Sequence, residues 1–180
     1  MTLFIDTHSN IITIALLGKT NIIKQKETNH KHSEHVLNMI KSILDENIIK
    51  KEDISEIIVV NGPGSFTGIR IGVVIAKTLS YTLNIKIKVI SSLEVFGISE
   101  NKPFDLIVVE DTKGFYYLTS DLKNPQYLLK NDFEIFVNNH NYIVSTNKEY
   151  NFEKILYYSK KIDYSDPKDV NPIYIKRLNV

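Results

Sequence analysis

The feature that most constrains this chain is an apolar strand that runs directly into a glycine turn and a long helical pattern. Residues 57–60 form a continuous β-branched run, which Asn61-Gly62-Pro63-Gly64 interrupts. Such a run is typical of a strand covered on both faces. A helical apolar pattern follows over 67–83, and a second β-rich run occupies 87–90. Strand, helix and strand in this order predict a parallel crossover and therefore an α/β fold.

Three strands and a helix are predicted before this unit. The β-rich runs 3–5 and 11–17 are separated by short polar side chains that favour a turn, and 22–27 continues the pattern. We therefore expect a three-stranded meander. From Ser33, a candidate N-cap, apolar residues recur at helical spacing up to Leu44.

The second half of the chain predicts a smaller lobe. Asn101-Lys102-Pro103 breaks the pattern near the midpoint. Further strand candidates and one helix follow, at 106–109, 115–118, 126–129, 142–144 and 152–161. We therefore expect residues 1–100 to form an N-terminal lobe and residues 101–180 a smaller C-terminal lobe.

Composition and charge exclude several classes of protein. The 180 residues, 43% hydrophobic and 24% charged, match one folded domain or two small lobes. The net charge is +1 and the only arginines are Arg70 and Arg177, so we do not expect unaided nucleic-acid binding. The absence of cysteine excludes disulfides and thiolate metal sites. The longest apolar stretch, 11–17, is too short for a membrane span and no basic leader precedes it, so we expect a cytoplasmic protein.

The glycine segment 62–72 does not fit the common phosphate loops. A Walker loop needs Gly-x-x-x-x-Gly-Lys, but Thr67 stands five places after Gly62, and the dinucleotide fingerprint Gly-x-Gly-x-x-Gly fails at the same residue. What remains is a tight turn that ends at the exposed amides of a helix N-terminus, where an anion can sit. The candidate anion- or nucleotide-binding residues are Asp6, Gly64, Ser65, Phe66 and Thr67.

The helix predicted over 67–83 has more apolar surface than one sheet contact covers. Small residues recur at every fourth position, Gly68, Gly72, Ala76 and Ser80, and let another backbone come close. Apolar side chains point in nearly every other direction, and those of the preceding helix cover an arc of roughly 160°, wider than the ~100° that a sheet contact needs. The second cover is either the other lobe or another protein, and the wide first helix favours a partner.

We therefore predict a partner interface on these two helices. Its residues are Val36, Met39, Ile40, Ile43, Gly68, Ile69, Gly72, Val73, Ala76 and Leu79. Burial of this area would drive association at ~25 cal/mol per Å², less the costs of ordering. A charge at Ile40 or Val73 is expected to abolish pairing and to leave the monomer folded. The same face is open to a symmetric homodimer when the chain is alone.

Residues 62–72, Gly-Pro-Gly-Ser-Phe-Thr-Gly-Ile-Arg-Ile-Gly, resemble the hallmark of the bacterial TsaB family, also called YeaZ. Further matching motifs span the chain, at Ile5-Asp6-Thr7, His32-Ser33-Glu34, Ser91-Ser92-Leu93-Glu94, Asp111-Thr112-Lys113-Gly114 with Tyr116, and Pro172-Ile173-Tyr174-Ile175-Lys176. The resemblance implies an actin-like, RNase H-like (ASKHA) two-lobe fold, with a mixed sheet flanked by helices. Because chains of this family are usually longer, it also implies a reduced second lobe.

The resemblance further implies a function and a set of partners. TsaB-like proteins are non-catalytic subunits of the machinery that makes threonylcarbamoyladenosine in tRNA, and they pair with the catalytic TsaD protein through their two N-terminal helices. We therefore expect a TsaD-like partner, a TsaE-like ATPase in the same complex, and contact with tRNA only through that complex. ATP and metal are expected in the partner subunits, and no cofactor is expected in this chain.

An enzyme, either an actin-like ATPase or a metallopeptidase-like hydrolase, stays open as the alternative. The related catalytic subunit holds its metal with a His-x-x-x-His pair, and the matching positions here are Ser92 and Phe96, neither of which can replace an imidazole. Actin-like ATPases use an Asp-x-Gly-Thr hairpin for phosphate and magnesium. Here Asp6-Thr7-His8-Ser9 keeps the carboxylate but not the glycine.

The other candidate catalytic and metal-binding groups are incomplete. His30, His32 and His35 lie close in sequence but lack an evident fourth ligand. Ser65 lacks both flanking glycines of the Gly-x-Ser-x-Gly nucleophile turn. We therefore expect neither a catalytic residue nor a metal site. A third hypothesis, an independent RNA-binding module, is disfavoured by the balanced charge.

Overall fold

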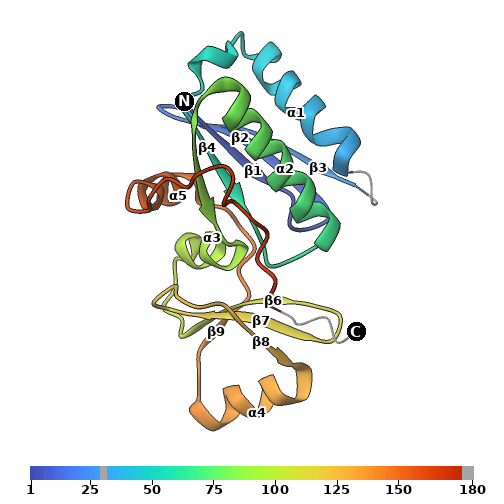
Figure 1. Cartoon of the computed structure of the whole chain (residues 1–180). Coiled ribbons are helices and arrows are strands. Elements are labelled where there is room, and N and C mark those ends of the chain that lie inside the picture. The colour runs from blue at the N-terminus through green and yellow to red at the C-terminus, as the bar shows by residue number, and fades with distance from the viewer. Residues whose placement is uncertain (29–31, 176–180) are drawn as a thin grey trace.

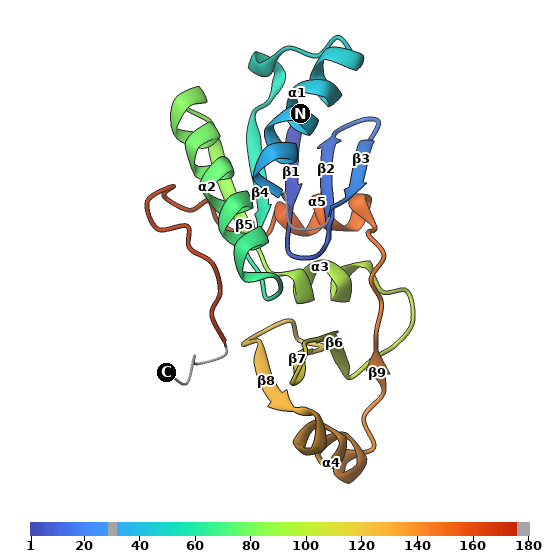
Figure 2. The same ribbon diagram turned by 90° about the vertical axis from the view of Figure 1, so that its right-hand side faces the viewer.

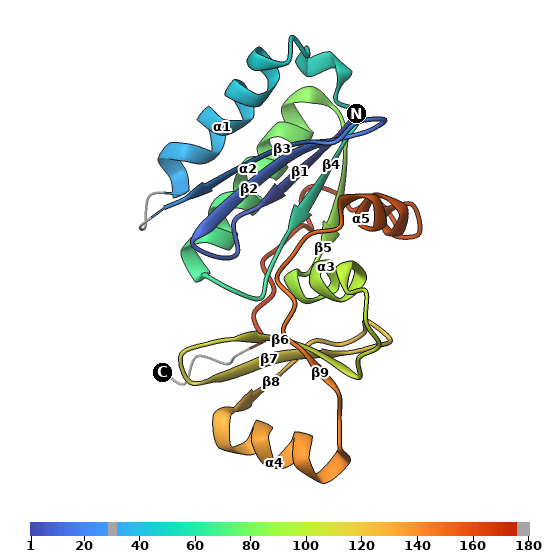
Figure 3. The ribbon, with the colours of Figure 1, turned by 180° about the vertical axis from the view of Figure 1, so that it is seen from behind.

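The computed structural model describes residues 1–28 and 32–175, which form two lobes, each built on its own β-sheet (Figure 1). In the first lobe, α1 and α2 lie on one face of the sheet, while α3 and α5 lie on the other side (Figures 1 and 3). α4 covers the far side of the second sheet. None of the helices in these ranges has the length and apolar character needed to cross a bilayer. This arrangement confirms the predicted α/β fold class.

The first sheet has the strand order β3-β2-β1-β4-β5. In chain order its strands are β1 (Thr2–Asp6), β2 (Ile11–Leu17), β3 (Ile22–Glu27), β4 (Glu56–Val60) and β5 (Lys86–Ile90). The first three form the predicted antiparallel meander, and β4 pairs in parallel with both β1 and β5. Side chains alternate between the two faces, so Leu3 and Ile5 pack under α1 and α2 while Phe4 packs on the opposite side.

Two long helices connect the strands of the first lobe. α1 (His32–Glu46) leads through a short 3-10 turn, η1 (Lys51–Asp53), to β4, and α2 (Phe66–Leu83) joins β4 to β5. Ser65 is the N-cap of α2, because its hydroxyl accepts a hydrogen bond from the Gly68 amide at 3.3 Å. α1 begins at His32, so the candidate cap Ser33 lies inside its first turn.

The second sheet has the order β8-β7-β6-β9. Its elements are β6 (Leu106–Glu110), β7 (Gly114–Thr119), β8 (Gln126–Leu129), α4 (Lys130–His140) and β9 (Val144–Ser145). The sequence missed α4 and also α3 (Ser92–Ser99), which joins the lobes. α3 carries a local signal, since Ser91 and Glu94 form a reciprocal capping box. α4 has none at its start, where Leu129 is a cap without a side-chain hydrogen bond.

The chain returns to the first lobe after β9, which corrects the boundary expected at residues 101–180. On α5 (Phe152–Ser159), the Phe152 ring packs edge-on against Phe4, with centroids 5.5 Å apart. The carbonyl of Ser159 accepts a 2.6 Å hydrogen bond from the buried Lys88 ammonium of β5. Residues 164–175, here called the C-terminal strap, then run beside α2 (Figure 2). The second face of the first sheet is apolar, and α5 packs against it.

Candidate functional site

α1 and α2 bury most of the residues that we predicted at a partner interface. Val36, Met39, Ile40, Ile43, Gly68, Ile69, Gly72, Val73 and Ala76 are buried in the chain's own core, and Leu79 is partly buried. The expectation that the monomer leaves these side chains uncovered is therefore wrong. The apolar arc of α1 is wide because this helix packs on the sheet and on α2 at the same time. One chain supplies both covers.

A different set of side chains on the same helices faces outward. We call it the outer helix face, and it consists of Leu37, Phe66, Arg70, Val74 and Tyr81. Leu37 is 53% exposed, Val74 60% and Tyr81 75%. The four residues on α2 follow one another at intervals of four, four and seven, so they line one side of the helix.

Leu37 lies on the flank of α1 that faces α2. The opposite flank is identified by its bonds to β3: the Lys24 ammonium reaches Glu46 Oε1 at 2.6 Å, and Lys26 Nζ lies 3.3 Å from His35 Nδ1. On a helix of 3.6 residues per turn, Leu37 is turned well away from these positions. The exposed part of α1 therefore adjoins that of α2.

The C-terminal strap borders α2 on its other flank. Lys77 Nζ donates to the carbonyls of Lys168 and Val170 at 3.1 and 3.0 Å. Nearer the helix start, the Arg70 guanidinium lies 3.7 Å from the centre of the Phe66 ring, and its Nε donates to the Tyr174 hydroxyl at 2.8 Å. This stack fixes a cation and two partly exposed aromatic rings at one end of the outer helix face.

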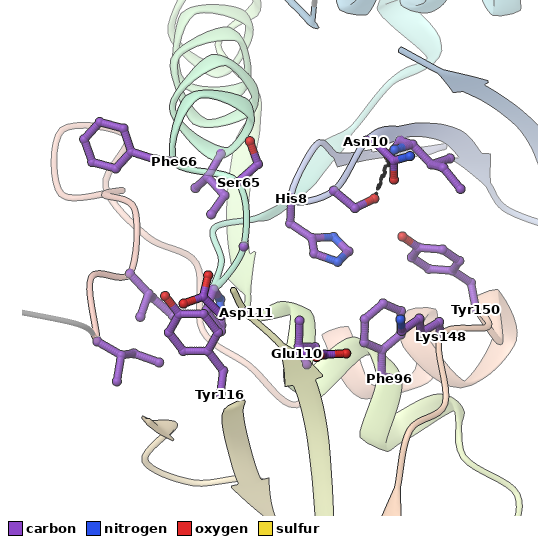
Figure 4. A pocket seen from close by; sticks show the side chains of 18 of the residues that line it. His8, Asn10, Ser65, Phe66, Phe96, Glu110, Asp111, Tyr116, Lys148 and Tyr150 are labelled. Atoms are coloured by element: carbon purple, nitrogen blue, oxygen red, sulfur yellow. Dashed lines mark hydrogen bonds between the residues drawn. The ribbon is translucent and has the colours of Figure 1, made fainter. Parts of the chain in front are cut away.

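A cleft of about 1400 Å³ separates the lobes at the N-terminus of α2 (Figure 4). The glycine turn and the β1–β2 turn form its first-lobe wall, the end of β6 with the following turn forms its second-lobe wall, and the segment before α5 closes it. Of the candidate anion-binding residues, Gly64, Ser65 and Phe66 line this cleft. Thr67 is exposed on α2 but is not among the lining residues, and Asp6 lies beneath the wall, fully buried.

The Asp6 carboxylate is held by three donors of its own chain. Its Oδ1 accepts from the His8 amide at 2.9 Å and lies 2.7 Å from His8 Nδ1, and its Oδ2 accepts from the Tyr150 hydroxyl at 2.9 Å. Burial, and next the nearby Asp6 charge, raise the pKa of Tyr150 well above its ordinary value, so this hydroxyl remains a donor. Asp6 therefore orients His8 and Tyr150 and has little capacity left for a ligand.

Glycines bring the start of α2 against the β1–β2 turn, as the small-residue spacing predicted. A Cβ atom on Gly68 would lie 2.1 Å from the Thr7 carbonyl oxygen, and one on Gly72 would lie 2.3 Å from Thr7 Oγ1. The Ser65 amide donates to the His8 carbonyl at 2.6 Å. The first turn of α2 is thereby fixed beside His8.

The positions that would match a His-x-x-x-His metal pair have structural roles here. The Ser92 hydroxyl is buried and donates to the Pro63 carbonyl at 2.7 Å. The Phe96 ring is buried and packs edge-on against the His8 ring, with centroids 5.4 Å apart. Neither side chain offers a metal ligand.

The histidine cluster before α1 falls mostly outside the described residues. His30 and the side chain of His32 are among the residues left undescribed, and His35 contacts Lys26. Across 1–28 and 32–175, no three histidine, cysteine, aspartate or glutamate side chains gather in a way that would hold a metal ion.

Sequence comparison connects the chain with one tRNA-modification family. Residues 19–109 match the family described as TsaD, tRNA N6-adenosine threonylcarbamoyltransferase. The tRNA threonylcarbamoyladenosine biosynthesis protein TsaB of Bacillus subtilis (strain 168) is 39% identical over 108 residues, 59% of this chain and 47% of that protein. The protein of the same name from Buchnera aphidicola subsp. Baizongia pistaciae is 37% identical over 81 residues, 44% of this chain and 37% of that protein. The matched region thus spans less than half the length of these relatives.

The five-stranded order of the first lobe, partly repeated in the second, defines an actin-like, RNase H-like protein. A solved structure described as an uncharacterized protein with similarity to peptidase YeaZ, from Pseudomonas aeruginosa, superposes with a TM-score of 0.77 at 15% identity, and covers 97% of this chain and 99% of that one. The chain belongs to the TsaB (YeaZ) family.

Most residues that line the cleft were not predicted as site residues, and His8 and Tyr150 are the two that contact Asp6. His8 has a sequence signal, because residues two apart in an extended segment point to the same side, and this places its ring beside the Asp6 carboxylate. Tyr150 has none, since it reaches Asp6 from 144 positions away.

Proposed function

We propose that this chain is the non-catalytic partner of a TsaD-type threonylcarbamoyltransferase, needed to modify the adenosine next to the anticodon of tRNA. The names of the TsaB relatives and the matched TsaD family support this role. In the proposed complex the catalytic subunit holds the metal, a TsaE-like ATPase turns over ATP, and tRNA is bound by the assembly. This chain acts through its shape.

The outer helix face is the observation that carries the proposal. α2 is covered by the sheet beneath it, by α1 on one flank and by the C-terminal strap on the other, so this face is the side of α2 that residues 1–28 and 32–175 leave open. Phe66, Arg70 and Tyr81 are of the aromatic and arginine types that are enriched at protein interfaces. Leu37 and Val74 add exposed apolar area beside them. We place the catalytic subunit on Leu37, Val74 and Tyr81.

The contacts in the cleft support a non-catalytic role. Asp6, the one carboxylate that matches the phosphate hairpin of actin-like ATPases, already accepts three hydrogen bonds. At the metal-pair positions stand Ser92 and Phe96, with roles in packing. The enzymatic alternative would therefore need groups other than those that its relatives use.

A charge on the outer helix face tests the docking site. Val74→Asp and Leu37→Asp place a carboxylate on exposed positions, so the chain should stay folded while affinity for the TsaD-like subunit falls at least about thirtyfold, as expected for a central contact worth ~2 kcal/mol. The measurement is titration calorimetry with the purified subunit. Ile135→Asp on α4, where Ile135 is 59% exposed, is the matched control and should bind normally.

Unchanged affinity in both outer-face variants would move the interface elsewhere. The non-catalytic part of the proposal is tested separately, with the purified chain alone. ATP turnover or stoichiometric zinc or iron in that preparation would favour the enzyme. A homodimer that Val74→Asp dissociates would show that the same face self-associates.

A further inference from the structure

Arg70 is a cation of the outer helix face without an acidic partner among the described residues. Its side chain is exposed, and the sequence of α2 contains no aspartate or glutamate. None of the ion pairs within residues 1–28 and 32–175 includes its guanidinium. The other cation of α2, Lys77, is held against two carbonyls of the C-terminal strap. Arg70 is therefore the one cation that α2 contributes to the outer helix face.

The guanidinium of Arg70 is held in a fixed orientation. Its Cζ lies 3.7 Å from the centre of the Phe66 ring, and its Nε donates to the Tyr174 hydroxyl at 2.8 Å. The two aromatic rings also contact each other, with centroids 5.7 Å apart. Stacking covers a face of the guanidinium and leaves its charge intact, while its donors lie in the plane of the group. Arg70 therefore loses little side-chain freedom when it binds another group.

The remaining donors of Arg70 match the shape of an oxyanion. With Nε engaged by Tyr174, the N–H groups of both terminal nitrogens, Nη1 and Nη2, have no hydrogen-bond partner within the described residues. These two nitrogens form one end of a rigid planar fork, and their spacing fits the two oxygens of a carboxylate. Phosphate oxygens fit the same fork, so the surroundings of the side chain must decide between the two groups.

The surroundings of Arg70 favour a protein carboxylate over an RNA phosphate. Surfaces that follow an RNA backbone line up several cations, whereas α2 contributes one to this face. On the same side of the helix stand Val74 and Tyr81, which are 60% and 75% exposed. An arginine beside exposed aromatic and aliphatic side chains is typical of the surfaces that proteins use to bind one another.

We propose that Arg70 binds an aspartate or glutamate side chain of the TsaD-like subunit, with Nη1 and Nη2 donating to its two carboxylate oxygens. This contact rests on the proposed function and adds the chemistry by which the partner is selected. Apolar side chains of the outer helix face can pack against any matching apolar surface, whereas a guanidinium buried without an acid disfavours the wrong one. Arg70 is thus a specificity-determining residue, and Tyr174 positions it.

Titration calorimetry of the full chain with the purified TsaD-like subunit, without tRNA or nucleotide, tests the contact. Arg70→Gln removes the charge of an exposed side chain, so the fold should be retained while affinity falls at least about tenfold. Added salt should weaken binding of the unmodified chain, and it should weaken binding of the variant less. Lys160→Gln removes the same charge at the end of α5, on the other side of the first sheet (Figures 1 and 3), and as the matched control it should bind normally.

Tyr174→Phe tests the positioning role of the strap. This variant keeps the aromatic ring and the Arg70 charge but leaves Nε without its acceptor. Affinity should therefore fall about threefold, while the salt dependence stays that of the unmodified chain. Unchanged affinity would overturn the positioning role of Tyr174.

A cross-link identifies the group that pairs with position 70. Arg70→Lys places an amine there, and a carbodiimide joins an amine to a carboxylate in contact with it through an amide bond. Mass spectrometry of the treated complex should find the introduced amine joined to an aspartate or glutamate of the TsaD-like subunit. The complex of Arg70→Gln has no amine at this position, so the same linked peptide should be absent from it.

Several results would overturn the contact and leave the proposed function standing, because in each the unmodified chain still binds the TsaD-like subunit. Arg70→Gln could bind as tightly as the unmodified chain, or the cross-link from position 70 could reach only a second copy of this chain. A loss of affinity that occurs only when tRNA is added would assign the guanidinium to a phosphate. If the unmodified chain does not bind the subunit at all, the proposed function fails and this contact fails with it.

Discussion

The strands of the second lobe, β8-β7-β6-β9, repeat the order and directions of β3-β2-β1-β4 in the first. β6 runs antiparallel to β7 and parallel to β9, as β1 does to β2 and β4. α4 crosses from β8 to β9 as α1 crosses from β3 to β4. After β4 the first lobe adds α2 and β5, whereas after β9 the described chain sends α5 back toward the first lobe (Figure 1).

This difference shows which lobe supports the other. β1 and most of β4 are buried on both faces, and the core between the sheet, α1 and α2 is formed within the first lobe. The second lobe covers one face with α4, while Ile107 and Leu118 on its other face pack in a cluster with Phe4, Phe96 and Ile155. The second lobe therefore depends on α3, α5 and the first sheet for half of its core.

The largest expected effect is a loss of stability in both lobes, caused by one substitution in the core of the first lobe. Val73 is 2% exposed, so Val73→Asp buries an unpaired charge and should cost more than about 4 kcal/mol of unfolding free energy. The neighbouring Val74 is 60% exposed, and Val74→Asp should stay within about 0.5 kcal/mol. Urea unfolding followed by circular dichroism measures both. A folded, stable Val73→Asp chain would contradict the burial described here and restore Val73 as a surface residue.

An intermediate effect should stay inside the second lobe. The Phe133 ring of α4 is 6% exposed, and its centroid lies 4.7 Å from that of Phe115 and 5.8 Å from that of Tyr117. Phe133→Ala should remove about 3 kcal/mol of local stability, because it leaves a cavity between α4 and the sheet. Hydrogen exchange should then accelerate about a hundredfold in β6 and β7 and remain unchanged in β1 and β4.

The matched control for this variant lies on the same helix. Ile135→Ala removes an exposed side chain and should change exchange little anywhere. If Phe133→Ala accelerated β1 as much as β6, the lobes would unfold as one unit and the asymmetry between them would be only geometric.

The same asymmetry explains what the sequence predicts well. The strands of the first sheet can be predicted from their apolar runs, because a continuous apolar run is typical of a strand that is buried on both faces. The small-residue spacing of α2 correctly predicts a close approach, which proves to be with Thr7. The capping pair of Ser91 and Glu94 is a sequence signal for the start of α3, although the sequence analysis did not predict this helix.

What the sequence predicts poorly depends on contacts between distant segments. The wide apolar arcs of α1 and α2 indicate that each helix must be covered from two directions. They do not reveal that α1, α2 and the C-terminal strap cover one another. The predicted interface therefore selected the most apolar positions, such as Ile40 and Val73, which are the ones a folded chain buries first. The sequence prediction of the candidate site is incomplete for the same reason, because Tyr150 and Tyr174 reach the site only once distant segments pack together.

The smallest expected effect concerns the contact that ties the segment before α5 to β1. Burial and the Asp6 charge raise the pKa of Tyr150 above its ordinary value of 10.0, so the folded chain holds this proton more tightly than the unfolded chain does. The stability gained is complete below pH ~10 and is lost as the pH rises further, because tyrosine then ionises only in the unfolded state.

Tyr150→Phe should cost about 1–2 kcal/mol at pH 7, since Asp6 loses a donor. Its deficit relative to the unmodified chain should shrink by about 1.4 kcal/mol per pH unit above 10. Urea unfolding of both proteins between pH 8 and pH 11, at roughly half-unit steps, measures this difference. A deficit that stays constant across the range would mean that the folded chain does not raise the pKa of Tyr150, and that packing of its ring alone joins this segment to the first lobe.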